Sequence, residues 1–143
     1  MGEDTSLKMT RVFNAPRDLV FKAWVEVEQM KRWFCPYDHW ALEITNDPRV
    51  GGAYRIVMKN PDTKENHIVR GVYREIRAPE RLIFTWQSEI IAGFPETLVT
   101  LEFRDLGGKT ELTLTHEALP TPELLDKHTH GWNLCLARLA KAV

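Results

Sequence analysis

The last part of the chain, residues 121–143, restricts the possible fold more than any other segment. No proline follows Pro122 there, and apolar side chains recur every three or four residues, as they do along one face of an α-helix. That face consists of Leu125, His128, Trp132, Cys135, Leu136, Leu139 and Val143. We predict one long helix that packs this face against the rest of the protein.

A glycine, Gly131, lies beside this apolar face in the middle of the predicted helix. Glycine in a helix interior costs roughly 0.5–1 kcal/mol relative to alanine. A sequence that accepts this loss on a buried face usually needs space there. We therefore expect free volume between the helix and its neighbours at Gly131.

The N-terminal part of the chain predicts one strand followed by two short helices. The strand covers Leu7–Phe13. Asn14 is expected to cap the first helix, with Pro16 in its first turn. The second helix is expected over Val27–Phe34, because Pro36 disfavours helical backbone at the residue before it.

The middle of the chain predicts six more strands, because apolar and polar residues alternate there between turn signals. These segments lie near residues 40–45, 54–59, 67–76, 82–87, 99–103 and 112–116. The segment His67–Ile76 is expected to be buried on both faces, as a central strand would be. Short turns between consecutive strands favour an antiparallel sheet. With one long helix to cover one face, we expect an α+β fold in which seven strands curve around that helix.

Composition excludes several classes of function. The chain has 143 residues, a hydrophobic fraction of 43% and a net charge of −1. This length fits one domain, residues 1–143. The absence of a basic excess argues against nucleic acid as a partner. No apolar run approaches the ~18–20 residues that would span a membrane.

The first residues and the cysteines of the sequence favour the cytoplasm. The first residues lack the charged-then-apolar order of a signal peptide. Met1, Gly2 and Ser6 match an N-myristoylation pattern, but acidic residues follow Gly2 and no basic patch supports membrane binding, so we do not expect acylation. Cys35 and Cys135 are too few for a disulfide framework or a zinc site.

Motifs for common cofactors and for hydrolytic catalysis are missing from the sequence. There is no glycine-rich nucleotide motif, and neither Ser6 nor Ser88 occurs in a nucleophile elbow. His128 and His130 differ by about 200° in direction on a helix, so they are not expected to hold a metal together. The same angles place His128 toward the sheet and His130 toward water. We expect no cofactor and no metal ion.

Five short motifs occur in the order found in one protein family. They are Gly51-Gly52-Ala53-Tyr54, the run from Gly71 to Ile76, the run from Pro79 to Trp86, the run from Thr110 to His116, and His128-x-x-Gly131-Trp132. From Met9 to Val143 the chain resembles the START-like superfamily (SRPBCC, similar to the birch pollen allergen). Within it, the chain resembles the branch named after the activator of the heat-shock-protein-90 ATPase.

The resemblance implies a helix-grip fold, with a cavity between a curved sheet and a long C-terminal helix. In relatives this cavity takes hydrophobic ligands such as lipids, polyketides or hormones. The inward positions of the predicted strands and helix give ten candidate ligand-binding residues: Trp33, Trp40, Tyr54, Met58, Val69, Tyr73, Trp86, His116, His128 and Trp132. Two simpler interpretations stay open, because the tryptophans can serve as core, and His116 and His128 can hydrogen-bond each other or nearby backbone.

The main functional hypothesis is a binding protein for a small hydrophobic or amphipathic molecule. One alternative is an enzyme of the cyclase or dehydratase kind without a cofactor, in which His116 or His128 acts as general base. A second alternative is a co-chaperone-like module that docks on a heat-shock-protein-90 ATPase through its outer surface. The important residues lie inside the cavity for the first two functions and outside it for the third.

Overall fold

A computed structural model describes residues 5–143, so the N-terminal acylation pattern lies partly outside the described residues. Seven strands and three helices follow one another along these residues. In chain order they are β1 (Leu7–Phe13), α1 (Arg17–Val25), α2 (Val27–Met30), β2 (Ala41–Asn46), β3 (Ala53–Lys59), β4 (Asn66–Arg77), β5 (Arg81–Ser88), β6 (Thr97–Asp105), β7 (Thr110–Glu117) and α3 (Pro122–Ala142).

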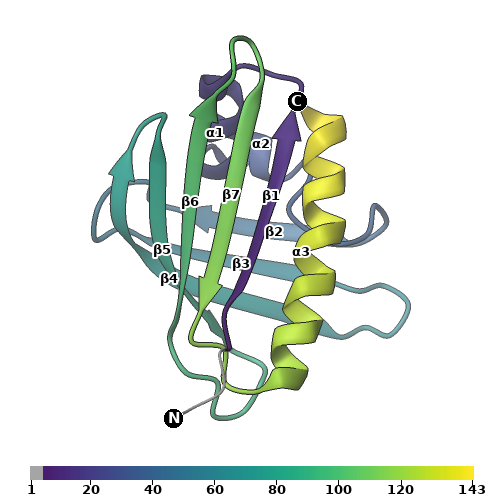
Figure 1. The fold of residues 1–143 in the computed structure, drawn as a ribbon. Coiled ribbons are helices and arrows are strands. Elements are labelled where there is room, and N and C mark those ends of the chain that lie inside the picture. The colour runs from purple at the N-terminus through teal and green to yellow at the C-terminus, as the bar shows by residue number, and fades with distance from the viewer. Residues whose placement is uncertain (1–4) are drawn as a thin grey trace.

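The seven strands form one antiparallel sheet in the order β1-β7-β6-β5-β4-β3-β2. Strands β2 to β7 lie side by side in the order in which they follow one another along the chain. β1 is the exception, because it pairs with β7, with Phe13 opposite Thr110. The sheet is strongly curved, so that β2 to β4 cross the direction of β6, β7 and β1 at a steep angle (Figure 1). The expected α+β helix-grip architecture, with two short helices between the first two strands, is confirmed.

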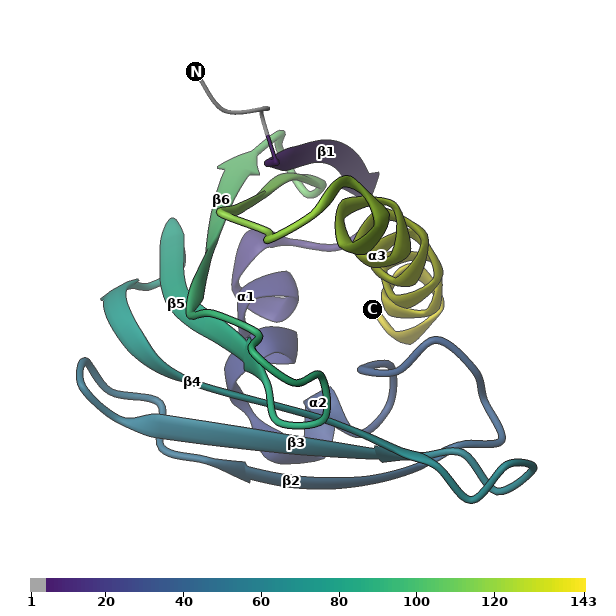
Figure 2. The ribbon, with the colours of Figure 1, turned by 90° about the horizontal axis from the view of Figure 1, so that it is seen from below.

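All three helices lie on the concave side of the sheet (Figure 2). The convex side therefore faces solvent, and the expectation that the segment His67–Ile76 is buried on both faces is wrong. In β4 only Val69 and Tyr73 are buried, whereas Arg70 and Arg74 are exposed. β4 lies inside the sheet, between β3 and β5, yet helices cover one of its faces only.

The first helix begins later than the sequence predicts. Arg17 is its first residue, and Pro16 occupies the N-cap position without a side-chain hydrogen bond. The Pro16 carbonyl accepts hydrogen bonds from the backbone N–H groups of Leu19 (3.1 Å) and Val20 (3.2 Å). The expectation of an Asn14 cap is therefore wrong, because Asn14 lies two residues before the N-cap.

The second helix is shorter than expected, since it ends at Met30 and not at Phe34. Trp33, Phe34 and Cys35 are all buried. A helix turns by about 100° per residue, so three consecutive side chains cannot all face one core. The chain leaves the helix before these residues, and the Trp33 indole N–H then donates to the Ala23 carbonyl at 2.9 Å.

The long C-terminal helix agrees closely with the sequence prediction. Thr121 caps it by accepting a hydrogen bond from the Leu124 backbone N–H at 3.1 Å, and Pro122 stands in the first turn. Its buried residues all belong to the predicted apolar face: Trp132, Cys135, Leu136 and Leu139. Residues 5–143 include no helix long and apolar enough to cross a membrane.

Gly71 in β4 lies where the backbone of β5 leaves no room for a side chain. A Cβ atom at this position would come within 1.9 Å of the Thr85 carbonyl oxygen. The Tyr54 hydroxyl donates to the same carbonyl, and the Thr85 hydroxyl accepts from the Val72 backbone N–H at 2.9 Å. The absence of a side chain at Gly71 therefore permits the hydrogen bonds that join β3, β4 and β5.

Gly71→Ala should destabilise the protein by about 1–3 kcal/mol or more, because backbone atoms would have to move to admit the methyl group. Gly131→Ala is the matched control, since a Cβ there meets no atom within 4 Å. It should stabilise by about 0.5–1 kcal/mol, as alanine does at an unstrained helix position. Urea titrations of both variants measure the two free energies of unfolding. If Gly131→Ala lost as much stability as Gly71→Ala, the two glycines could not differ in the space around them as described.

Candidate functional site

A cavity of about 440 Å³ lies between α3 and the strands β3 to β5. The loops before β2 and after β5 complete its wall. Its lining residues are Phe34, Pro36, Tyr37, Trp40, Met58, His67, Ile68, Val69, Trp86, Ser88, Ile90, Ile91, Leu124, Lys127, His128, His130, Gly131, Trp132, Leu134 and Cys135. Exposed Tyr37, Ile90 and Ile91 belong to this wall, so the cavity reaches the protein surface there.

Six of the ten sequence-predicted residues line this cavity. They are Trp40, Met58, Val69, Trp86, His128 and Trp132. They come from the loop before β2, from β3 to β5 and from α3. Gly131 also lines the wall, and the space beside it is empty, so the glycine opens into the cavity.

The structure places the other four predicted residues in the core, away from the cavity wall. Trp33 is fully buried and packs on Trp24, with ring centroids 4.5 Å apart. Tyr54 and Tyr73 border a separate void of about 10 Å³, which is at the lower limit for one water molecule. His116 is fully buried behind Trp86 and Trp132. Strand alternation gives the face on which these side chains lie, but not which part of that face the short helices fill.

Sequence periodicity missed the residues at the cavity mouth, because most of them lie in loops. Tyr37 comes from the loop before β2, while Ile90 and Ile91 come from the loop after β5. Two adjacent isoleucines in a loop were an available signal, since large aliphatic side chains need a reason to be exposed outside regular structure. His130 is exposed, as predicted, but it also lines the mouth.

A buried hydrogen-bond chain joins α3 to the sheet behind the cavity. The Trp132 indole N–H donates to Nδ1 of His116 at 3.1 Å. Because an indole can only donate, Nδ1 carries no proton and Nε2 of His116 does. Nε2 therefore donates to the Thr97 hydroxyl at 2.8 Å, and that hydroxyl donates to the Trp86 carbonyl at 2.6 Å. Every polar atom of this chain has a partner.

His128 forms a second chain on the cavity wall itself. The Trp86 indole N–H donates to Nε2 of His128 at 3.3 Å. Nδ1 of His128 lies 2.8 Å from the Leu124 carbonyl oxygen and donates its proton there. The rings of His116 and His128 are 5.2 Å apart, edge to face, and each hydrogen-bonds a tryptophan and not the other histidine.

Burial favours the neutral form of both histidines. Burial lowers the pKa of His116 to about 3, and the neighbouring His128 acts in the same direction. Burial also lowers the pKa of His128, against the effect of its hydrogen bond to the Leu124 carbonyl. The lone pair of each imidazole accepts an indole N–H, so neither ring offers an unoccupied basic nitrogen to a bound molecule.

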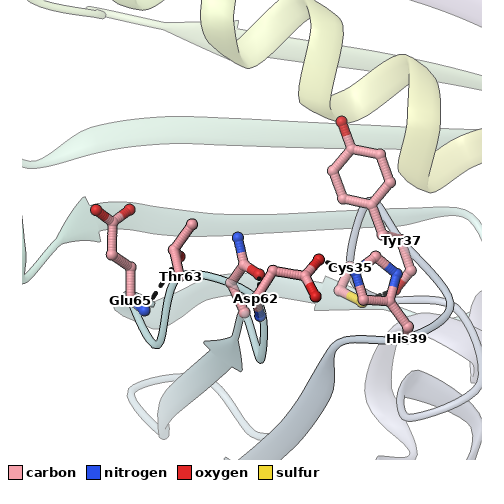
Figure 3. A network of polar contacts seen from close by, with 7 residues as sticks. Cys35, Tyr37, His39, Asp62, Thr63 and Glu65 are labelled. Carbon is pink, nitrogen blue, oxygen red and sulfur yellow. Dashed lines mark hydrogen bonds and ion pairs between the residues drawn. The ribbon is translucent and has the colours of Figure 1, made fainter.

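The loop of residues 35–40 forms the mouth and is fixed on two sides. Arg138 of α3 donates to the Cys35 carbonyl at 2.9 Å and pairs with Asp38 at 2.9 Å. On the other side, His39 lies 2.9 Å from Asp62 in the β3–β4 turn (Figure 3). Tyr37 projects from this loop toward α3 (Figure 3). The anchors hold the aromatic side chains of the mouth in place.

The described residues, 5–143, contain no cluster of three or more metal-ligating side chains. Cys35 and Cys135 are both buried free thiols. Burial raises the pKa of Cys135 to about 12, so its thiol is protonated and unreactive. The site is an apolar cavity with an inner wall of hydrogen-bonded rings and a mouth that carries both apolar and polar side chains.

The curved sheet, the long helix and the cavity between them define a helix-grip protein of the START-like class. Comparison of the sequence with protein families identifies the particular family, because the model described as "Activator of Hsp90 ATPase homolog 1-like protein" matches residues 14–143. The chain belongs to this family. No functionally curated protein is significantly similar to the chain.

Solved structures with the same fold cover nearly the whole chain. Protein CV1439 from Chromobacterium violaceum has 26% sequence identity and a TM-score of 0.89, over 97% of this chain and 96% of that one. The AHSA1 protein SPO3351 from Silicibacter pomeroyi has 22% identity and a TM-score of 0.83, over 95% of each chain. CalU16 from Micromonospora echinospora has 25% identity and a TM-score of 0.73, over 96% of this chain and 74% of that one.

The depressed pKa of His116 predicts that the protein loses stability in mild acid. Unfolded chain binds a proton at His116 below about pH 6.5, whereas the folded protein stays neutral there down to about pH 3. The unfolded state therefore binds more protons in this window, and the free energy of unfolding falls as the pH falls. From pH 7 to pH 5 the loss due to His116 should be about 2 kcal/mol.

Urea titrations at both pH values on wild type and His116→Gln measure this effect. The glutamine amide can accept from Trp132 and donate to Thr97, but it does not titrate. Contributions from other groups are common to both proteins and cancel in the comparison. An equal loss of stability in the two proteins would contradict the assignment to His116.

His128→Ala should destabilise the protein more than His130→Ala does. The first change leaves the Trp86 indole N–H without its acceptor in a part-buried site, at a cost of about 1–3 kcal/mol. The second removes an exposed side chain and should change stability by about 0.5 kcal/mol or less. Equal midpoints for the two variants in a denaturant titration would be inconsistent with this difference in burial.

Proposed function

We propose that this protein binds a small apolar or amphipathic molecule in the cavity between α3 and the sheet. The cavity itself carries the proposal, since its volume of about 440 Å³ falls in the range of small-molecule sites. Its wall is rich in aromatic and aliphatic side chains, and the mouth gives a path for entry. We further propose that residues 1–143 act as one domain in the cytoplasm, where the two free cysteines would stay reduced.

The state of the two histidines favours binding over the cyclase or dehydratase alternative. A general base needs an accessible lone pair within hydrogen-bond reach of its substrate. The lone pair of His116 is taken by Trp132 behind the wall, and that of His128 is taken by Trp86. These contacts support a rigid wall whose polar atoms are already satisfied.

The co-chaperone alternative rests on the description of the family and on no feature of the described residues. It would place the important residues on the outer surface, whereas ligand binding places them in the cavity. Substitutions that fill the cavity without changing the outer surface separate the two functions.

Gly131→Leu should strongly weaken binding while the protein still folds, because the leucine side chain would enter the cavity. Gly131→Ala is the matched control and should leave affinity within about twofold, because a Cβ there meets no atom within 4 Å. N-phenyl naphthylamine, an uncharged fluorescent probe, reports binding by its emission. Circular dichroism and thermal unfolding establish that both variants fold.

We expect saturable binding of the probe to wild type and Gly131→Ala, and at least about tenfold weaker binding to Gly131→Leu. Native mass spectrometry of gently purified wild type complements this test by detecting any co-purified molecule. A folded Gly131→Leu protein that binds the probe with unchanged affinity would overturn the proposal, as would the absence of probe binding to wild type.

A further inference from the structure

The indole and imidazole groups of the inner cavity wall have no hydrogen-bonding capacity left for a ligand. Trp86 donates to His128, which donates to the Leu124 carbonyl, and Trp132 donates to His116. A polar ligand group placed here would give up its water without gaining a hydrogen bond, which is unfavourable. The part of a ligand that reaches this wall must be apolar.

The mouth of the cavity differs from this wall, because it carries hydrogen-bond donors and one cation beside its apolar side chains. Lys127 and His130 line it from α3, with His67 and Ser88 on the sheet side. Among the described residues that line the cavity there is no aspartate or glutamate, and Lys127 is the one lysine or arginine. The side chains of this wall therefore offer positive charge and donors, but no negative charge, to a ligand.

Two carboxylates next to residues of the cavity wall, Glu89 and Asp38, are paired with arginines. Glu89, which follows Ser88, forms a two-pronged pair with Arg55 at 2.8 and 3.2 Å. Asp38 pairs with Arg138 at 2.9 Å. Each of these carboxylates is therefore engaged by an arginine and not by Lys127.

Glu123 is the one competing partner of Lys127 found in the described chain, at 3.5 Å and one helical turn earlier. The two side chains are 79% and 67% exposed, respectively. Exposed pairs of this kind contribute little free energy, so Lys127 can turn to a ligand at small cost. An anion at the cavity mouth is partly shielded from water and attracts the ammonium more strongly than an exposed carboxylate does.

Helical spacing brings Lys127 and His130 together beside empty space. Residues three and four apart are neighbours on a helix surface, so His130 and Gly131 both lie one turn beyond Lys127. A Cβ at Gly131 would meet no atom within 4 Å. The missing side chain leaves room at the mouth for a small anionic group next to two donors.

We propose that the ligand is an apolar, ring-sized molecule with one anionic group, which Lys127 and His130 bind at the mouth beside Gly131. This inference rests on the proposed function, because it assigns the charge of the molecule that the cavity takes. The apolar body lies against Trp86 and Trp132, and the carboxylate or sulfonate stays at the mouth.

Two probes with the same ring system test the inference directly. Anilinonaphthalene sulfonate carries one negative charge, and N-phenyl naphthylamine lacks it. Wild type should bind the anionic probe about three- to tenfold more tightly than the neutral one. The preference should shrink with added salt, because salt screens the contribution of Lys127.

Variants of three side chains on α3 separate this contribution from general electrostatics. Lys127→Met should weaken binding of the anionic probe by about three- to tenfold and leave the affinity for the neutral probe within about twofold of wild type. Glu123→Gln should strengthen binding of the anionic probe, because it releases Lys127 from its ion-pair partner. Lys141→Met makes an equal charge change at an exposed position outside the cavity wall. It should leave the affinity for both probes unchanged.

Failure of the inference and failure of the proposed function give different results. If both probes bind equally and Lys127→Met affects neither, the cavity binds apolar molecules but the anionic preference is overturned. Equal weakening of the anionic probe by Lys127→Met and Lys141→Met also overturns it, because the effect would then come from net charge. If neither probe binds wild type, both proposals fall together.

Discussion

The hydrogen bond between Trp132 and His116 fixes the geometry on which the rest of the structure depends. It joins the middle of α3 to β7, and Thr97 extends it to β6 and to the Trp86 carbonyl of β5. A helix rotated by one residue would turn by about 100° and break this contact. The bond therefore sets the rotation of α3, and with it the direction in which Gly131, His128 and Cys135 face.

A cavity remains because different helices cover the two ends of the concave sheet. At one end, Trp24 and Trp33 of the α1–α2 region fill the space, and Trp33 has no exposed surface. At the other end, α3 carries a glycine where a large side chain would have closed the gap. Loops and not a further helix form the remaining wall, so the space stays open at the mouth.

The parts of the fold that follow from periodicity could be predicted from the sequence. The depth at which each inward side chain lies in the core, and the geometry of the loops, could not. Alternation gave all seven strands, and helical spacing placed Trp132, Cys135 and Leu139 on the buried face of α3. The same alternation could not tell that Tyr54 and Tyr73 face a filled part of the core. That difference depends on where the short helices pack, which is a tertiary property.

The boundaries of the two short helices were predicted wrongly, and in each case the reason can be seen in the chain around the helix. Asn14 is a good capping residue by type, but the chain bends there and the helix starts at Arg17. The helix signal over Val27–Phe34 was overruled by burial, because Trp33 and Phe34 must both reach the core. Mouth residues such as Ile90 lie in loops, where no periodic pattern exists to reveal them.

The polar network behind the cavity bears on chemistry as well as on shape. An imidazole inside an apolar site is often a general base, but only when its lone pair is available. Here each imidazole lone pair accepts an indole N–H, and burial favours the neutral form of both rings. To act as a base, either ring would have to release a tryptophan that forms part of the wall. The contacts that hold the wall in shape thus also occupy the basic nitrogens of both rings.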